Sequence, residues 1–138
     1  MPNPLVVIRD LVAAQVGNSL PAGALWGTAF PTQLGADVTD ASKGVFATST
    51  YVQYGWDGTP SDADNRENTA MRITVWKLKG HFNETQDVAL DLRYALLQAE
   101  HVDSWRIDRG AGRLAGTDPD TGYPFCTFSL NLALHAPA

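Results

Sequence analysis

The stretch FCTFSLNLAL, residues 125–134, alternates apolar side chains with polar or small ones. Successive side chains of a β-strand point to opposite faces of a sheet, so this spacing predicts a strand with one buried face. The residues on the apolar face are Cys126, Phe128, Leu130, Leu132 and Leu134. The rest of the chain must supply the strands that pair with this one and the layer that covers its apolar face.

Other stretches carry weaker strand patterns. VFATSTYVQYGW at 45–56 is rich in β-branched and aromatic residues and is predicted to be a long strand. AMRITVWKL at 70–78 alternates like the last strand, and we expect it to pair with 45–56 as a hairpin with a long loop. Short strands are expected at 102–109 and within 24–30, and the glycine-rich segment 110–124 is expected to be a connection.

Two segments have apolar residues at helical spacing. Asn3 can cap a helix over residues 4–16, because proline, here Pro4, is tolerated at the first helical position. A second helix is predicted within NETQDVALDLRYALLQAEH at 83–101, with Asn83 as its cap. The apolar face of this helix consists of Val88, Ala89, Leu92, Ala95, Leu96 and Ala99.

The order of these elements limits the fold class. The predicted order is a helix, then strands, then a second helix, then further strands. A doubly wound parallel sheet would need a helix between each pair of strands, so this order argues against that fold. The composition, with 44% hydrophobic and 18% charged residues, is typical of a globular domain. We therefore predict one α+β domain over residues 1–138, with a mainly antiparallel mixed sheet of about four to five strands covered by two helices.

Charge and cysteine content exclude some classes of function. Fifteen acidic and ten basic residues give a net charge of -5, which argues against tight binding to a nucleic-acid backbone. The single Cys126 cannot form an internal disulfide and fits synthesis in a reducing cytoplasm. Arg9 and Asp10 interrupt the apolar N-terminal stretch, and no basic region precedes it, so we expect neither a signal peptide nor a membrane span.

The stretch GTDPDTGYP before the last strand superficially resembles a calcium loop. An EF-hand loop that started at Asp118 would need glycine at its sixth position and glutamate at its twelfth, whereas Gly122 is fifth and Ser129 is twelfth. A turn explains the same residues: Pro119 fixes the corner, Asp118 or Asp120 bonds the local backbone, and Gly122 adopts a positive φ. We expect the turn and no metal ion.

The sequence contains no convincing catalytic set. His81, His101 and His135 are far apart, and none has the spacing of a two-histidine metal site. Cys126 lies on the apolar strand face, where a thiol packs as a small hydrophobe, although a cysteine hydrolase with His81 or His135 as its base stays open. GAGRLAG at 110–116 lacks the helix that a dinucleotide fingerprint requires. We expect no catalytic residue and no cofactor.

The segment DGTPSDADNREN at 57–68 has no apolar periodicity, and we expect an exposed, mobile loop. Its carboxylates could form a ligand cluster, but charge runs in such loops are more often simply solvated. We expect the loop to contact other subunits after assembly, with the flanking tryptophan as an anchor. The candidate assembly interface consists of Trp56, Asp57, Asp62, Asp64 and Arg66.

Three stretches in a fixed order carry a resemblance to a known family. They are RITVWKL at 72–78, DVALDLRYALLQ at 87–98 and WRIDRGAGRLAGTDPDTGYPFCTFSLNLAL at 105–134. A strand that ends in tryptophan, a helix rich in alanine and leucine, and a D-x-D-T-G-x-P turn before an alternating strand resemble the tail terminator proteins of long-tailed bacteriophages. The resemblance covers roughly the second half of the chain, and neighbouring neck and minor tail families share its features.

The resemblance implies a structural virion protein without catalytic residues, cofactor or metal. Its expected form is a hexameric ring at the head-proximal end of the tail tube, which stops tail growth and joins the tail to the neck. The implied partners are further copies of the chain, the tail tube protein and a neck or head-completion protein; DNA passes through the lumen without specific binding, and no membrane is involved. The expected location is the tail or neck of the virion, after synthesis in the host bacterial cytoplasm.

Three alternatives stay open. One is another head-tail connector, neck or minor tail protein. A second, from a different class, is a small cysteine- or carboxylate-dependent enzyme that uses Cys126 or the acidic loop. The third is a ligand-binding module.

Overall fold

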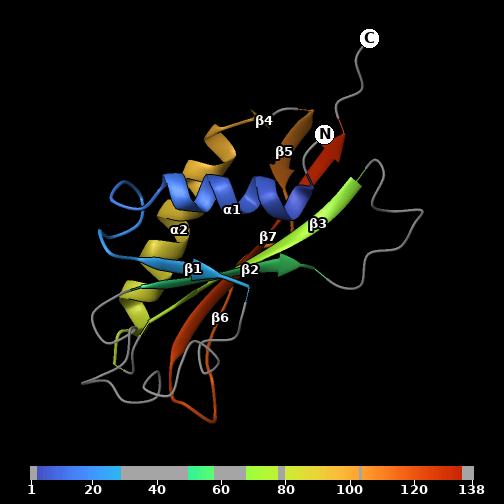
Figure 1. Cartoon of the computed structure of the whole chain (residues 1–138). Helices are drawn as coiled ribbons and strands as arrows, with labels where there is room; N and C mark the ends of the chain where they lie inside the picture. The colour runs from blue at the N-terminus through green and yellow to red at the C-terminus, as the bar shows by residue number, and fades with distance from the viewer. Residues whose placement is uncertain (1–2, 29–49, 58–67, 78–79, 103, 135–138) are drawn as a thin grey trace.

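The chain forms a curled mixed β-sheet with two helices packed on one of its faces (Figure 1). The structure is a computed structural model and describes residues 3–28, 50–57, 68–77, 80–102 and 104–134. The α+β class predicted from the sequence is confirmed.

The sheet contains more strands than the sequence predicts. In chain order the elements are α1 (Pro4–Ala14), β1 (Leu25–Gly27), β2 (Tyr51–Trp56), β3 (Asn68–Trp76), α2 (Phe82–Gln98), β4 (His101–Val102), β5 (Trp105–Arg109), β6 (Leu114–Thr117) and β7 (Pro124–Leu134). The strand order is β1-β2-β3-β7-β5-β4, with β6 also paired to β7. Among the described strands, only β1 and β2 pair in parallel. The prediction of about four to five strands is too low, because strands of two to four residues leave too short a pattern to recognise.

Helix α1 begins where its sequence predicts. The Asn3 side chain accepts a hydrogen bond of 2.8 Å from the backbone N–H of Leu5, and Pro4 occupies the first turn, where no backbone donor is needed. The helix ends at Ala14 rather than at residue 16. Gly17 then adopts a φ of 85°, a left-handed conformation that glycine accepts without steric cost.

The predicted hairpin between the second and third strands is present. β2 and β3 are antiparallel, with Tyr51 opposite Trp76 and Trp56 opposite Met71. The strand β2 starts at Tyr51, and the earlier part of the predicted strand, 45–49, lies outside the described residues.

Strand β7 lies in the middle of the sheet and has partners on both sides. β3 pairs along one side, while β5 and β6 follow one another along the other. Arg109 faces Leu130 and Leu114 faces Thr127, so the four residues 110–113 lie opposite only two residues of β7 and form a bulge. A Cβ atom on Gly110 would lie 2.6 Å from the carbonyl oxygen of Ser129, and this position therefore requires glycine.

Three boundaries differ from the predictions. The segment 102–109 is not one strand, because β4 turns back sharply and pairs with the start of β5. The predicted connection 110–124 contains β6. Helix α2 begins at Phe82 rather than after Asn83; the carbonyl of His81 accepts from both the backbone N–H and the hydroxyl of Thr85, which extends the first turn backwards.

The core lies between the helices and one face of the sheet. The buried residues of α1 and α2 pack against alternate residues of the strands: Val7, Ile8, Val12, Ala89, Leu92 and Leu96 meet Val52, Met71, Ile73, Val75, Cys126, Phe128, Leu130 and Leu132. The apolar face predicted for the last strand is therefore confirmed as core, apart from the partly buried Leu134. Among the described residues, neither helix is long and apolar enough to cross a membrane.

The substitution Leu130→Ala tests the role of β7 in this core. Leu130 is 0% exposed, and its truncation should cost about 2–5 kcal/mol of unfolding free energy, because transfer energy and packing are both lost. The matched control is Asn131→Ala, the next residue of the strand, whose exposed side chain lies on the opposite face. Denaturant unfolding of both variants measures the difference, and a loss below about 0.5 kcal/mol for Leu130→Ala would contradict the assignment of this face to the core.

Candidate assembly surface

In the described part of the chain, no helix covers the second face of the sheet, which we call the open face. Since strand side chains alternate, this face receives the residues between the core positions of β2, β3 and β7. Its central residues are Tyr51, Gln53, Arg72, Thr74, Trp76, Phe125, Thr127 and Ser129. The open face is more polar than the core. One of its ends is charged and the other is aromatic.

At one end, Asp57 is held by two neighbours from the paired strands. Arg72 donates to one carboxylate oxygen of Asp57 at 2.8 Å, and the buried Ser129 hydroxyl donates to the other. Arg72 and Ser129 are direct cross-strand neighbours of β3 and β7, so strand register brings both to the same carboxylate. The hydrogen bond from Ser129, assisted by Arg72 and opposed by partial burial, holds the pKa of Asp57 below its usual value.

The other end of the open face is aromatic. Tyr51, Trp76 and Tyr123 form a small buried cluster, against which Leu25 and Phe125 pack. The rings of Trp76 and Phe125 lie 5.2 Å apart between centroids at an interplanar angle of 48°. Burial, together with the nearby Tyr54, raises the pKa of Tyr51 to about 12.

A groove connects the two ends. It has a volume of about 940 Å³, and its walls include Asp57, Arg72, Trp76, Leu114 and Phe125. Hydrogen bonds between its polar side chains fix much of the floor: Trp76 Nε1 donates to Gln53 Oε1 at 3.0 Å, and the hydroxyls of Thr74 and Thr127 are 2.9 Å apart. These groups can hydrogen-bond or stack on a partner without rearranging.

The described residues that line the groove do not pair a nucleophile with a base. Ser129 is bonded to Asp57, and a carboxylate with a lowered pKa is a weak base at neutral pH, so it does not activate the serine. Among the residues that the structure describes, no three histidine, cysteine, aspartate or glutamate side chains lie close enough together to hold a metal ion.

Cys126, the alternative nucleophile considered from the sequence, lies on the core side of β7 and is 1% exposed. Burial raises the pKa of the Cys126 thiol, and Arg113 and Arg93 offset this rise only in part. The neutral thiol is the unreactive form, since a cysteine nucleophile acts as the thiolate. His81 is exposed near the start of α2, with Nδ1 at 2.9 Å from Glu84 Oε2, and His135 lies outside the described residues.

The segment between β6 and β7 is the turn that the sequence predicts. Asp118 Oδ2 accepts from the backbone N–H of Thr121 at 2.9 Å and from its hydroxyl at 2.8 Å, and Gly122 has a φ of 76°. The carboxylate of Asp118 is thus used to close the turn, as an aspartate commonly does in this position.

The structure describes two of the five residues in the predicted assembly interface. Trp56 is partly buried and packs against the core, whereas Asp57 lies at the edge of the open face. Asp62, Asp64 and Arg66, with most of the acidic loop, lie outside the described residues. Their role in assembly stays a prediction.

The partners of Asp57 are not predicted by the sequence. In the sequence, Arg72 is one residue of an alternating stretch, and Ser129 lies on the non-core face of the last strand. The two come together through the register between β3 and β7, which are separated in the chain by α2 and three short strands. Alternation identifies the face of each residue, but it does not identify the partner across the strand.

Comparison with known proteins gives little further information. No protein-family model matches the sequence, and no curated protein matches it either. Among solved structures, the chain is similar to one described as the structure of bacteriophage SPP1 gp17 protein, with 17% sequence identity and a TM-score of 0.49. The match covers 94% of this chain and 91% of that chain. An identity this low transfers no role to any residue.

The variant Asp57→Asn tests the network at the edge of the open face. Because the pKa of Asp57 is lowered in the folded state, its carboxylate contributes stability that is present above the usual aspartate pKa of 3.8 and is lost as the pH falls through the lower folded value. We expect the variant to lose about 1 kcal/mol of unfolding free energy near neutral pH. This difference from the parent protein should shrink below pH 3.8.

Denaturant unfolding between neutral pH and about pH 3 measures that dependence. The control is Asp120→Asn, an exposed residue in the turn between β6 and β7. A difference between parent and Asp57→Asn that stays constant over the whole range would contradict the network.

Proposed function

We propose that this chain is a structural subunit of a bacteriophage tail, a tail terminator that forms a ring at the head-proximal end of the tail tube. The ring stops tail growth and joins the tail to the neck. Its partners are further copies of the chain, the tube protein and a neck protein, and DNA passes through its lumen without specific contact. The subunit has no catalytic role.

The observation that carries this proposal is the order of three sequence stretches that resemble the tail terminator family. They correspond to β3, which ends at Trp76, to α2, and to the run from β5 through β7. The D-P-D-T-G stretch forms the turn between β6 and β7. These elements are neighbours in space: α2 packs over the face of β3 and β7, and β5 and β6 flank β7. The resemblance therefore rests on one connected structural unit rather than on scattered segments.

The surface supports assembly as the main activity. Large apolar side chains are exposed at several places: Trp26, Phe82, Leu90, Tyr94 and Leu114. Leu90 and Tyr94 lie one turn apart on α2 and form a contiguous exposed apolar area, and areas of this kind are common at surfaces that a partner covers. The net charge of -5 also suits the lining of a DNA channel, since an acidic lumen does not retain the phosphate backbone.

Mass photometry and electron microscopy of the purified protein test the proposal, alone and with phage tail tubes that lack a terminator. We expect particles of several subunits that bind at one end of the tube and prevent its further growth. Tubes that already carry their terminator are the control and should not bind. A protein that stays monomeric at all concentrations and ignores both kinds of tube would contradict the proposed function.

A further inference from the structure

The outer surface of α2, formed by Asp87, Leu90, Asp91 and Tyr94, faces away from the core and is both apolar and acidic. Leu90 is 48% exposed and Tyr94 is 68% exposed, so the middle of this helix presents a large apolar area to solvent. Neither Asp87 nor Asp91 forms an ion pair within the described part of the chain. Arg93, the one basic residue of α2, is partly buried on its flank.

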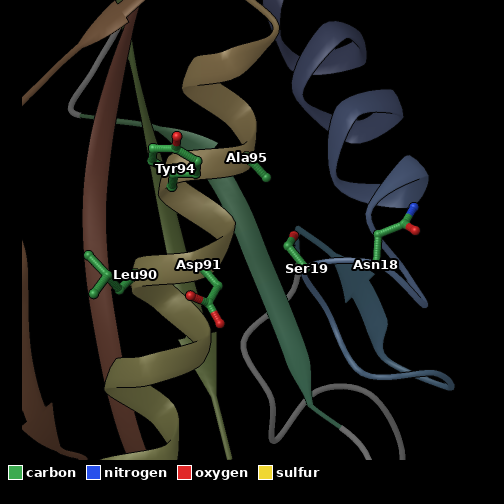
Figure 2. Close-up of a pocket in the computed structure, with 6 residues that line it drawn as sticks. All are labelled: Asn18, Ser19, Leu90, Asp91, Tyr94 and Ala95. Carbon is green, nitrogen blue, oxygen red and sulfur yellow. The ribbon is translucent and has the colours of Figure 1, made fainter.

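A hollow of about 570 Å³ lies beside this surface, between α2 and the turn that follows α1. Figure 2 shows Asp91 and Ala95 on the side of α2 that faces Ser19, with Leu90 and Tyr94 further round the helix. The hydroxyl of Ser19 has no hydrogen-bond partner among the residues that the structure describes. The residues that line the hollow include one carboxylate and no basic side chain. It therefore fits a cationic side chain with an apolar stem.

A surface of the opposite charge lies at the edge of the sheet, in the bulge between β5 and β6. The bulge edge, as we call Arg109, Arg113 and Leu114, is exposed, and Leu114 is 63% exposed. No acidic residue occurs from Arg109 to Thr117. Within the described residues, neither arginine forms an ion pair. The bulge edge is therefore apolar and basic.

The acidic outer surface of α2 and the basic bulge edge are complementary in charge to each other, and neither is complementary to a second copy of itself. A two-fold axis that passes through either surface brings that surface against its own copy, which would place carboxylate against carboxylate or arginine against arginine. A two-fold axis that pairs the acidic surface with the basic one uses both surfaces of both copies and stops at a dimer. A head-to-tail contact instead brings the acidic surface of one copy to the basic surface of the next. Repeated contacts of this kind close into a ring or extend into a filament.

We propose that copies of this chain associate head to tail, with the bulge edge of one copy docked on the outer surface of α2 of the next. Arg113 enters the hollow and pairs with Asp91 of the next copy, and Leu114 packs on Leu90 and Tyr94 of the next copy. This inference rests on the proposed function, because it assigns the subunit contact of the proposed ring.

The chemistry of arginine favours this arrangement over a simple charge contact. A guanidinium group presents five donors in a plane, matches a carboxylate with two parallel hydrogen bonds and stacks on aromatic rings. The hollow offers Asp91 for the first interaction and the ring of Tyr94 for the second. A lysine at position 113 keeps the charge but loses the paired hydrogen bonds.

Charge reversal tests the pairing in the full chain. We expect Asp91→Arg and Arg113→Asp each to weaken assembly by about tenfold or more, because like charges then meet in a partly enclosed space. The double variant should recover assembly, since the charges are exchanged rather than lost. Asp120→Arg, which makes the same charge change at an exposed turn, is the control and should assemble normally.

Thermal melting of each variant's monomer should match that of the parent protein, because both positions are exposed. Mass photometry over a concentration series gives the assembly constants. If both single variants assemble like the parent, or if the double variant does not recover, the proposed pairing is wrong.

A disulfide experiment separates the head-to-tail contact from a two-fold contact. The variants Tyr94→Cys and Leu114→Cys are oxidised separately and as a mixture, with the buried Cys126 left in place. A head-to-tail contact predicts a disulfide-linked dimer only in the mixture, and linked oligomers larger than a dimer when both cysteines are placed in one chain. A reciprocal two-fold contact would stop at the linked dimer in the doubly substituted chain. A linked dimer in either variant alone would instead show that a surface meets its own copy, and would overturn the inference.

The outcomes also separate this inference from the proposed function. Rings that form and cap tubes normally in all charge variants would leave the function intact and exclude this contact. A parent protein that never assembles, with or without tubes, would exclude both.

Discussion

The fold depends on the pairing of β7 with strands on both of its sides. Eleven residues, Pro124–Leu134, contact β3 along one side and β5 and β6 along the other, while their core side chains meet the helices. A slip of one residue in this register would turn Phe128 and Leu130 towards solvent and bury Ser129 under the helices. The alternation of β7 therefore determines which side chains form the core and which form the open face.

The same register shapes the open face and the bulge edge. On the open face, it brings Arg72 and Ser129 to Asp57 and fixes the polar end of the groove. At the sheet edge, the four residues opposite two of β7 form the bulge that carries Arg113 outward, and Gly110 permits the close approach of the backbones there. The helix layer supplies the complementary surface, since α2 buries Leu92 and Leu96 while Leu90 and Tyr94 stay exposed.

Local patterns in the sequence predict the parts of this structure that depend on nearby residues. The cap at Asn3, the apolar faces of both helices, the alternation of β7 and the turn closed by Asp118 all follow from short stretches. The parts of the structure that depend on pairing between strands far apart in the chain cannot be predicted from short stretches. β6 is missed because glycines surround its four residues, and the partners of Asp57 require a register that no local pattern contains. The bulge edge is not predicted either, because it also depends on the register of β5 and β6 against β7.

We propose that the chain is a structural subunit that assembles through the bulge edge and the outer surface of α2. The most direct measurement is an electron cryomicroscopy structure of the assembled particle. We expect a closed ring in which α2 of each copy contacts the bulge edge of its neighbour, with Arg113 near Asp91 across every contact. Pairs of copies joined by a two-fold axis, or a ring whose contacts leave Leu90, Tyr94 and Leu114 exposed, would contradict it.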